Sequence, residues 1–181
     1  MKEQLTEVVR SRGLIRFDAP VTLASGGQSR EFVDGKAALA RGADLELACR
    51  AMLAEFSDID FDCIGGLTMG ADQFAHVVAV LGHKSWFVVR KEAKGRGTAK
   101  LVEGTALGPD VRVLLVDDVV TTGGSIQRAH SAVSELGAVV VGAAALVDRG
   151  ELASRFFAER DIPYRPLVTY RDLGIEPVAT N

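Results

Sequence analysis

One stretch, residues 113–127 with the sequence VLLVDDVVTTGGSIQ, combines acids, hydroxyls and glycines in an order that suits ligand chemistry. An apolar strand is expected to run into two adjacent acids, and a turn at 121–125 then opens a helix. Backbone N–H groups at a helix N-terminus favour an anion, and glycines let the backbone approach it closely. The candidate residues of this stretch are Asp117, Asp118, Val119, Val120, Thr121, Thr122, Gly123, Gly124 and Ser125.

A phosphate fits the turn at 121–125, because such a turn presents several N–H and O–H donors to one point. Asp117 and Asp118 cannot contact the phosphate itself, but they suit ribose hydroxyls or the hydration shell of a Mg²⁺ ion. Together these groups describe a site for a sugar phosphate. In the alternative interpretation, the acids only cap the turn and the hydroxyls only cap the helix. The combination in this order after an apolar strand favours the site.

A second candidate segment is the long connection at 91–110, KEAKGRGTAKLVEGTALGPD, for which no helix is predicted. Loops of this length are uncommon in compact domains and usually act as lids. Its start is basic, whereas the chain as a whole is slightly acidic. We therefore expect an anion-binding lid rather than a solvated surface loop. The basic residues are Arg90, Lys91, Lys94, Arg96 and Lys100.

The elements that must position these residues alternate between strands and helices. Runs such as VRVLLV and AVVVGAAALV are continuously apolar, which is typical of parallel strands buried on both faces. In such sheets, ligands bind at the carboxyl ends of the strands. After a first helix at 3–12 and short strands within 14–35, the expected helices are 37–56 (starting late at Gly42), 71–81, 125–136 and 151–159, and the expected strands are 61–64, 85–89, 111–116, 139–147 and 164–168.

Composition narrows the class of protein. The chain has 181 residues, 48% of them hydrophobic, with 24 acidic and 21 basic residues and a net charge of −3. That balance disfavours a nucleic-acid binder, which needs a basic surface. Cys49 and Cys63 are isolated, so neither a disulfide framework nor a zinc site is expected. With no signal-peptide pattern and no apolar run of membrane-spanning length, we expect a cytoplasmic protein without membrane contact.

The stretch at 113–127 resembles the phosphoribosyl-pyrophosphate motif of the type I phosphoribosyltransferases, and further segments resemble the orotate phosphoribosyltransferases. Residues 87–104 are similar to their flexible catalytic loop, with its Arg-Lys-x-x-Lys core at Arg90, Lys91 and Lys94. LVDRGE at 146–151 resembles the strand end whose arginine, here Arg149, binds the orotate carboxylate. GGLTMGAD at 65–72 occupies the place of the pyrophosphate loop, and 23–36 that of a hood over the base.

This resemblance implies an α/β fold of the type I phosphoribosyltransferase kind, with a central, mostly parallel sheet flanked by helices and a small N-terminal hood. It implies one domain over 1–181, with the first helix and hood in 1–36 and the flexible catalytic loop in 91–110. It also implies Mg²⁺ as cofactor, held mainly through substrate and water with Asp117 and Asp118 as candidate contacts. The partners implied are phosphoribosyl pyrophosphate, orotate and a second copy of the chain, in a homodimer with shared active sites.

The implied reaction transfers the 5-phosphoribosyl group to orotate, giving orotidine 5′-monophosphate and pyrophosphate in pyrimidine biosynthesis. The implied catalytic residues are Lys94, Asp117, Asp118, Arg90 and Lys91. The implied donor-binding residues are those of 117–125 together with Arg90, Lys91, Lys94, Arg96, Thr68 and Met69. The implied orotate-binding residues are Phe32, Val33, Thr121 and Arg149.

Three positions depart from the family pattern. Ala24 and Met69 stand where lysines are frequent, and Arg96 stands where a histidine is usual. Lys36 is a candidate to restore one of the lost charges. These departures keep two alternatives open: a phosphoribosyltransferase for another nitrogenous base, and a non-catalytic regulator that binds the donor. A non-catalytic regulator of this kind is expected to lose its lid or to gain a basic surface. This chain keeps the lid and has a net charge of −3, so we rank that alternative last.

Overall fold

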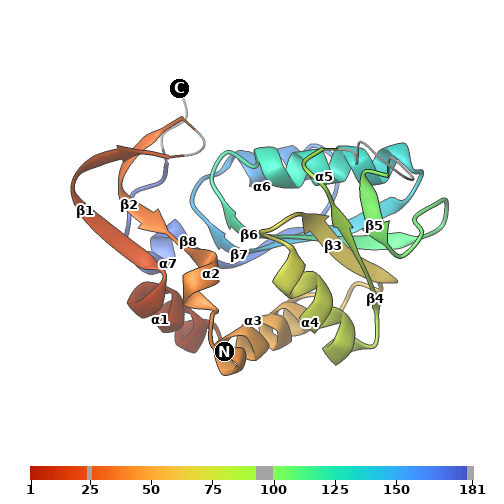
Figure 1. The fold of residues 1–181 in the computed structure, drawn as a ribbon, viewed down its shortest axis with the longest axis horizontal. Coiled ribbons are helices and arrows are strands. Elements are labelled where there is room, and N and C mark those ends of the chain that lie inside the picture. The colour runs from red at the N-terminus through yellow and green to blue at the C-terminus, as the bar shows by residue number, and fades with distance from the viewer. Residues whose placement is uncertain (24–25, 93–99, 179–181) are drawn as a thin grey trace.

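A six-stranded sheet with the strand order β5-β4-β3-β6-β7-β8 organises the protein (Figure 1). The computed structural model describes residues 1–23, 26–92 and 100–178. All neighbouring strands pair in parallel except β5, which is antiparallel to β4. The elements are α1 (Lys2–Arg12), β1 (Leu14–Thr22), β2 (Gln28–Val33), α2 (Gly35–Ala38), α3 (Gly42–Glu55), β3 (Cys63–Leu67), α4 (Asp72–Gly82), β4 (Ser85–Val89), β5 (Val102–Gly104), β6 (Arg112–Val120), α5 (Gly124–Glu135), β7 (Val139–Asp148), α6 (Leu152–Ala158), β8 (Tyr164–Thr169) and α7 (Tyr170–Leu173).

Helices cover both faces of this sheet, which explains why its central strands are continuously apolar. In β6, Leu114 and Val116 pack into a core shared with α1, α3 and α4. The alternating residues Val113 and Leu115 pack into a second core with α5 and α6. Figure 1 shows α5 and α6 along one side of the sheet and α3 and α4 along the other. The expectation of a buried parallel sheet is confirmed.

A separate two-stranded hairpin, β1 with β2, stands at one end of the sheet, where Figure 1 shows it in red and orange. Its antiparallel register pairs Leu14 with Val33. The helix α2 follows β2 after a single residue, Asp34, whose side chain accepts hydrogen bonds from the backbone N–H groups of the first turn. This hairpin is the hood that the sequence predicted between residues 14 and 35.

The structure differs from the sequence-based expectation at two functional segments. β6 extends to Val120, so Asp117 and Asp118 lie inside the strand and not after it. The segment 91–110 is not wholly a loop, because Val102–Gly104 forms β5 against β4. Three residues are too few to give a pattern against a background of loop residues, and the partner strand stabilises them.

Two smaller differences concern helices. The expected helix at 37–56 is divided into α2 and α3, and α3 begins at Gly42 as the sequence suggested. The four-residue α7 was not expected; the reciprocal hydrogen bonds between Thr169 and Asp172 begin it. Across the described residues, every helix is too short or too polar to cross a membrane.

Candidate active site

Two adjacent buried acids form the centre of the candidate site. Asp117 is 5% exposed and Asp118 is 8% exposed, near the carboxyl end of β6. Asp117 Oδ1 accepts a hydrogen bond of 3.0 Å from the N–H of Asp118, and Asp118 Oδ1 accepts one of 2.8 Å from the N–H of Val119. Burial and the neighbouring charge of Asp118 raise the pKa of Asp117 to about 7. A pair held in this way can accept hydrogen bonds from ligand hydroxyls.

Two glycines bring backbone segments against these acids. A Cβ atom placed on Gly70, in the connection between β3 and α4, would lie 2.4 Å from Asp117 Oδ1 and 2.6 Å from Asp118 Oδ1. A Cβ atom on Gly35 would lie 3.0 Å from Asp118 Cβ. A side chain at position 70 would therefore displace the two carboxylates, whereas one at position 35 would require Asp118 or Val119 to move by a few tenths of an ångström. Of the two predicted residues in this connection, Thr68 donates a hydrogen bond of 2.9 Å to Asp72 Oδ2, and Met69 is 66% exposed.

The turn after β6 leads into α5 and opens onto a cleft. Gly123 caps α5 with φ = +80°, a left-handed conformation that glycine adopts without strain. Gly124 and Ser125, in the first turn of α5, line the cleft together with Gly123. The cleft measures about 880 Å³ and is lined by Leu101, Asp117, Val119, Val120, Thr121, Thr122, Gly123, Gly124, Ser125, Gln127, Arg128, Ser131, Ala132, Glu135 and Phe156.

Arg149, directly after β7, is a buried cation at a second pocket. Its side chain is 1% exposed, and Nη1 donates a hydrogen bond of 2.7 Å to the carbonyl of Glu31 in β2. Nη2 donates one of 3.2 Å to Ser29 Oγ, whereas Nε is buried with no hydrogen-bond partner among the described residues. Burial lowers the pKa of the guanidinium. The pocket measures about 280 Å³ and is lined by Leu23, Phe32, Val33, Asp34, Gly35, Lys36, Asp118, Val119, Thr121 and Arg149.

Val119 and Thr121 line both the cleft and the pocket, so the two spaces adjoin at the carboxyl end of β6. One acid faces each: Asp117 lines the cleft and Asp118 lines the pocket. The structure thus brings together the predicted residues of 117–125 and the predicted base-binding residues Phe32, Val33 and Arg149. A ligand in the cleft would lie next to a second ligand in the pocket.

Arg90 and Lys91, the two lid residues that the structure describes at the start of the loop, are held by contacts near this cleft. Arg90 donates its backbone N–H to the carbonyl of Leu101 at 2.8 Å, and its side chain lies 3.5 Å from Glu103. Lys91 is exposed, and its carbonyl accepts a hydrogen bond of 2.7 Å from Arg128, which lines the cleft. Neither Arg90 nor Lys91 is among the described residues that line the cleft. Lys94, Arg96 and Ala24 lie outside the described residues.

Sequence reasoning missed part of the site. Arg128 and Gln127 line the cleft one turn into α5, and an arginine that soon follows a phosphate-type turn is a signal that was available. Lys36 was considered only as a replacement charge, but its Nζ lies 2.5 Å from Asp118 Oδ2. Burial alone would lower the pKa of Lys36, but the hydrogen bond to Asp118 and the charges of Asp118, Asp34 and Asp117 raise it.

The side chains of the site determine how a divalent cation could be bound. Within the described part of the chain, no group of three His, Cys, Asp or Glu side chains could hold a metal ion. Mg²⁺, however, commonly keeps several waters and uses only one or two carboxylates together with substrate phosphates. Asp117 and Asp118 beside an anion-binding turn fit that mode of binding.

Comparison with known proteins agrees with this geometry. The family model of the phosphoribosyl transferase domain matches residues 38–155. The chain is 41% identical to the orotate phosphoribosyltransferase of Streptomyces avermitilis, over 86% of this chain and 88% of that protein, and 36% identical to that of Pyrococcus abyssi, over 96% and 95%. It superposes with a TM-score of 0.78 and 34% identity on the Mycobacterium tuberculosis orotate phosphoribosyltransferase solved in complex with 5-phospho-α-D-ribosyl 1-diphosphate, covering 96% of this chain and 99% of that one. The chain therefore belongs to the orotate phosphoribosyltransferases and has the type I phosphoribosyltransferase fold.

Proposed function

We propose that the protein transfers the 5-phosphoribosyl group from phosphoribosyl pyrophosphate to orotate, releasing orotidine 5′-monophosphate and pyrophosphate. The carrying observation is the adjacency of two spaces: a cleft with a phosphate-type turn, and a pocket with the buried cation Arg149. Val119 and Thr121 line both spaces, so the sugar of one ligand would meet the ring of the other at this boundary. This reaction would place the protein in pyrimidine nucleotide biosynthesis.

The donor would bind with its 5-phosphate in the turn after β6. Residues 121–125 line the cleft at the start of α5, where their backbone N–H groups would receive the phosphate, and the hydroxyls of Thr121, Thr122 and Ser125 would add further donors. Asp117 and Asp118 would accept hydrogen bonds from the ribose hydroxyls through their carboxyl oxygens, which have lone pairs to accept them. Val119 and Val120 complete the wall of the cleft by packing.

Orotate would bind in the smaller pocket, where Arg149 can receive its carboxylate. A guanidinium matches a carboxylate through two parallel N–H donors, and the buried Nε has a donor to offer. Phe32 and Val33 supply apolar walls for the pyrimidine ring, and Thr121 adds a hydroxyl at the boundary with the donor. The pocket thus suits a small planar acid.

Pyrophosphate leaves from the side of the cleft next to the lid. We assign its charge to Arg90, Lys91 and Lys94, with Arg96 in support, because cations near a developing anion stabilise it. Thr68 and Met69 lie in the connection that packs its Gly70 against the acids, so this backbone would also border the pyrophosphate. Mg²⁺ bound to the donor through its phosphates and waters supplies further charge neutralisation.

The bond from C1 of the ribose to the pyrophosphate oxygen breaks as a bond from C1 to the ring nitrogen of orotate forms, and the proton of that nitrogen passes to the departing pyrophosphate or to solvent. Glycosyl transfer develops oxocarbenium-like positive charge at the sugar. The protein therefore acts mainly by positioning the two ligands and by electrostatics. A lid of 91–110 that closes over the cleft would exclude water, which could otherwise hydrolyse the donor.

Product analysis with a panel of bases tests this proposal. The purified protein is incubated with phosphoribosyl pyrophosphate, Mg²⁺ and either orotate, uracil, adenine or hypoxanthine, and nucleotide and pyrophosphate are both quantified. We expect both products in equal amounts with orotate, and at least a hundredfold lower kcat/KM with the bases that lack a carboxylate. A preference for another base, or donor binding without turnover, would refute the proposal.

We further propose a homodimer in which each lid serves the partner's site. The edge formed by α4 and β4 exposes large apolar residues, with Val80 74% and Trp86 39% exposed. The ring of His76, one turn before Val80, packs edge-on against Trp86 at 4.5 Å between centroids. Arg90, the first lid residue, follows directly after the last residue of β4. A second copy that binds this surface would therefore lie next to the start of the lid.

Mixing two inactive variants tests the shared sites. Lys94→Ala lacks a lid cation and Asp118→Asn lacks an acid, so one site of a mixed dimer would combine an intact lid with intact acids. We expect up to a quarter of the parent activity from an equimolar mixture, since half of the dimers are mixed and each has one good site. No recovery, when subunit exchange is demonstrated, would refute sharing of the lid.

The proposal takes residues 1–181 as one phosphoribosyltransferase domain, with the first helix and the hood in 1–36 and the catalytic loop in 91–110. It places the reaction in the cytoplasm. In support of that location, Cys49 and Cys63 are buried free thiols, as is usual in a reducing compartment.

A further inference from the structure

Lys36 links the hood to the acid pair. Its Nζ donates a hydrogen bond of 2.5 Å to Asp118 Oδ2, across 82 positions of sequence. The backbone of Lys36 is held as well, because its N–H donates at 3.0 Å to Asp34 Oδ1 in the first turn of α2. Both the backbone N–H and the side-chain ammonium of Lys36 are therefore held, and the ammonium contacts a carboxylate of the candidate site.

The approach of α2 to the acid is close enough to fix this contact. A Cβ atom on Gly35 would meet Asp118 Cβ at 3.0 Å and Val119 Cγ2 at 3.2 Å, so no other side chain separates α2 from β6 at this point. α2 also follows the end of β2, where Phe32 and Val33 line the base pocket. The wall of the base pocket and Lys36 thus belong to one short, continuous segment.

The carboxylate of Asp118 is oriented from two sides. Oδ1 accepts the N–H of Val119 at 2.8 Å, and Oδ2 accepts the ammonium of Lys36. Without the second contact, the carboxylate would be held by one backbone donor and would be repelled by the neighbouring charge of Asp117. The side chain of Lys36 is 49% exposed and also lines the base pocket. An ammonium has three donors, so it can hold Asp118 and still face a ligand.

We propose that Lys36 is a positioning residue that holds the Asp118 carboxylate in the orientation needed by the ribose hydroxyls of the donor. The inference rests on the proposed function, because it assigns the use of Asp118 to donor binding. It concerns the orientation of an acceptor, so its effect should appear in donor affinity and not only in turnover. It also makes a specific claim of dependence: Lys36 acts through Asp118.

A double-mutant cycle tests that dependence, with the dissociation constant of phosphoribosyl pyrophosphate measured by calorimetry in the absence of any base. Lys36→Met should weaken donor binding by about 10-fold or more, whereas Lys36→Arg, which keeps the charge, should stay within about 3-fold of the parent protein. In the Asp118→Asn background, Lys36→Met should change the constant by less than 3-fold, because effects on one contact are not additive.

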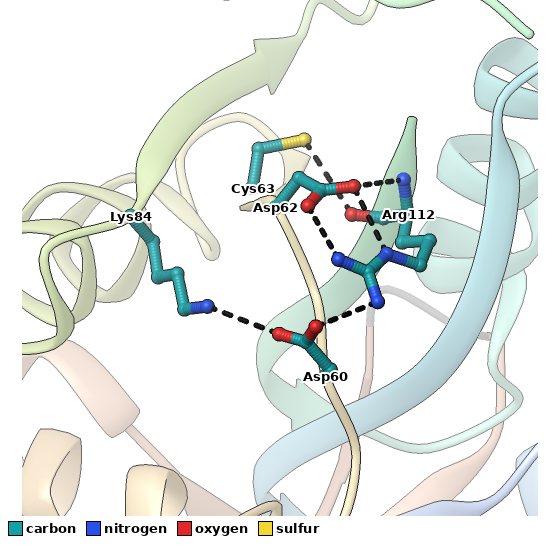
Figure 2. Close-up of polar contacts among 5 residues, drawn as sticks. All are labelled: Asp60, Asp62, Cys63, Lys84 and Arg112. Carbon is teal, nitrogen blue, oxygen red and sulfur yellow. Dashed lines mark hydrogen bonds and ion pairs between the residues drawn. The ribbon is translucent and has the colours of Figure 1, made fainter. Parts of the chain in front are cut away.

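Lys84 offers a matched control at the opposite end of the sheet. Its Nζ lies 3.4 Å from Asp60 Oδ1, in the ion-pair cluster of Figure 2, and is likewise a lysine paired with an aspartate on a neighbouring segment. Lys84→Met should leave donor binding within 2-fold of the parent. Thermal unfolding curves of all variants establish that each protein is folded at the temperature at which donor binding is measured.

Three results would overturn the inference. Equal losses from Lys36→Met with and without Asp118→Asn would mean that Lys36 acts independently of the acid. A Lys36→Arg protein as impaired as Lys36→Met would mean that the charge is not what matters, and an unchanged Lys36→Met protein would mean that the contact is dispensable. Because donor binding is measured without a base, the cycle remains informative even if the panel of bases refutes orotate as the acceptor.

Discussion

Replacing Arg149 by methionine should separate activity from stability. In the structure this guanidinium is 1% exposed and has no ion-pair partner within the described part of the chain; its two hydrogen bonds go to the Glu31 carbonyl and Ser29 Oγ. A carboxylate would complete the site only when orotate binds. The folded protein therefore holds a buried, unpaired cation in advance of its ligand, and such groups cost folding free energy.

The effect of Arg149→Met on stability depends on the balance between the hydrogen bonds of the guanidinium and the cost of burying its charge. The two hydrogen bonds contribute about 1.5–3 kcal/mol each, because a charged group donates them. Removing the guanidinium from water costs several kcal/mol, and leaving Nε without an acceptor adds roughly 1–3 kcal/mol. These opposing terms are similar in size. We therefore expect the free energy of unfolding of Arg149→Met to lie within about 2 kcal/mol of the parent value, which corresponds to a change of about 4–8 °C in Tm for a chain of this length.

Activity should respond far more strongly. Removing one partner of a buried, hydrogen-bonded charge pair costs about 2–5 kcal/mol, which is a loss of about 30-fold to a few thousand-fold in kcat/KM for orotate. Donor affinity should remain within about 3-fold, because Arg149 lies in the base pocket and not among the residues that line the larger cleft. The ratio of kcat/KM for orotate to that for uracil should fall accordingly.

The assay combines initial rates at varied orotate, donor calorimetry and thermal unfolding. Arg50→Ala is a suitable control, since Arg50 is an exposed arginine on α3 paired with Glu46. Unchanged orotate kinetics in Arg149→Met would refute the assignment of Arg149 to the carboxylate. A fall in Tm beyond about 15 °C would instead identify Arg149 as a structural anchor of the hood.

Two other perturbations test the site and the opposite end of the sheet. Gly70→Ala should raise the KM for the donor at least 10-fold with little change in Tm, because its Cβ would meet Asp117 Oδ1 at 2.4 Å. Gly42→Ala, at the start of α3 and with nothing within 4 Å, is the control, and equal KM values for the two variants would contradict the packing argument. Arg112 holds the pKa of Asp62 at about 2, below the usual 3.8, so it stabilises the folded state above about pH 4. The Tm difference between the parent and Arg112→Ala should therefore be largest near neutrality and shrink as the pH falls toward 2; a constant difference would show that this ion pair is not its source.

Local sequence was sufficient to predict the phosphate-type turn, because everything that makes it lies within about ten residues. An apolar run predicts the buried strand, and the glycines and hydroxyls of 121–125 predict the helix start. The structure places the acids inside β6, where Asp117 lines the cleft and Asp118 lines the smaller pocket. The parallel sheet was predictable for the same reason, since burial on both faces leaves a continuous apolar pattern.

Contacts between distant segments could not be predicted in this way. The contact of Lys36 with Asp118 and that of Arg149 with Glu31 depend on where the hairpin β1–β2 packs, and no local pattern encodes that placement. β5 is three residues long and exists because β4 offers it a partner. The role proposed for Arg149 came only from resemblance to a family, because a lone arginine after a strand has no pattern of its own.

The two ends of the parallel strands show why function and stability separate in this fold. At the amino ends, the ions compensate one another: Asp62 precedes β3, Arg112 begins β6 and Lys84 precedes β4. Figure 2 shows Asp60 between Lys84 and Arg112, and Arg112 paired with Asp62 as well. At the carboxyl ends, Arg149 has no ion-pair partner among the described residues, and the two buried acids of β6 share a single cation, Lys36, which lies on Asp118. Ligands with a carboxylate, hydroxyls and phosphates would supply the missing partners there. Substitutions at the carboxyl ends should therefore reduce affinity more than stability, whereas those at the amino ends should do the reverse.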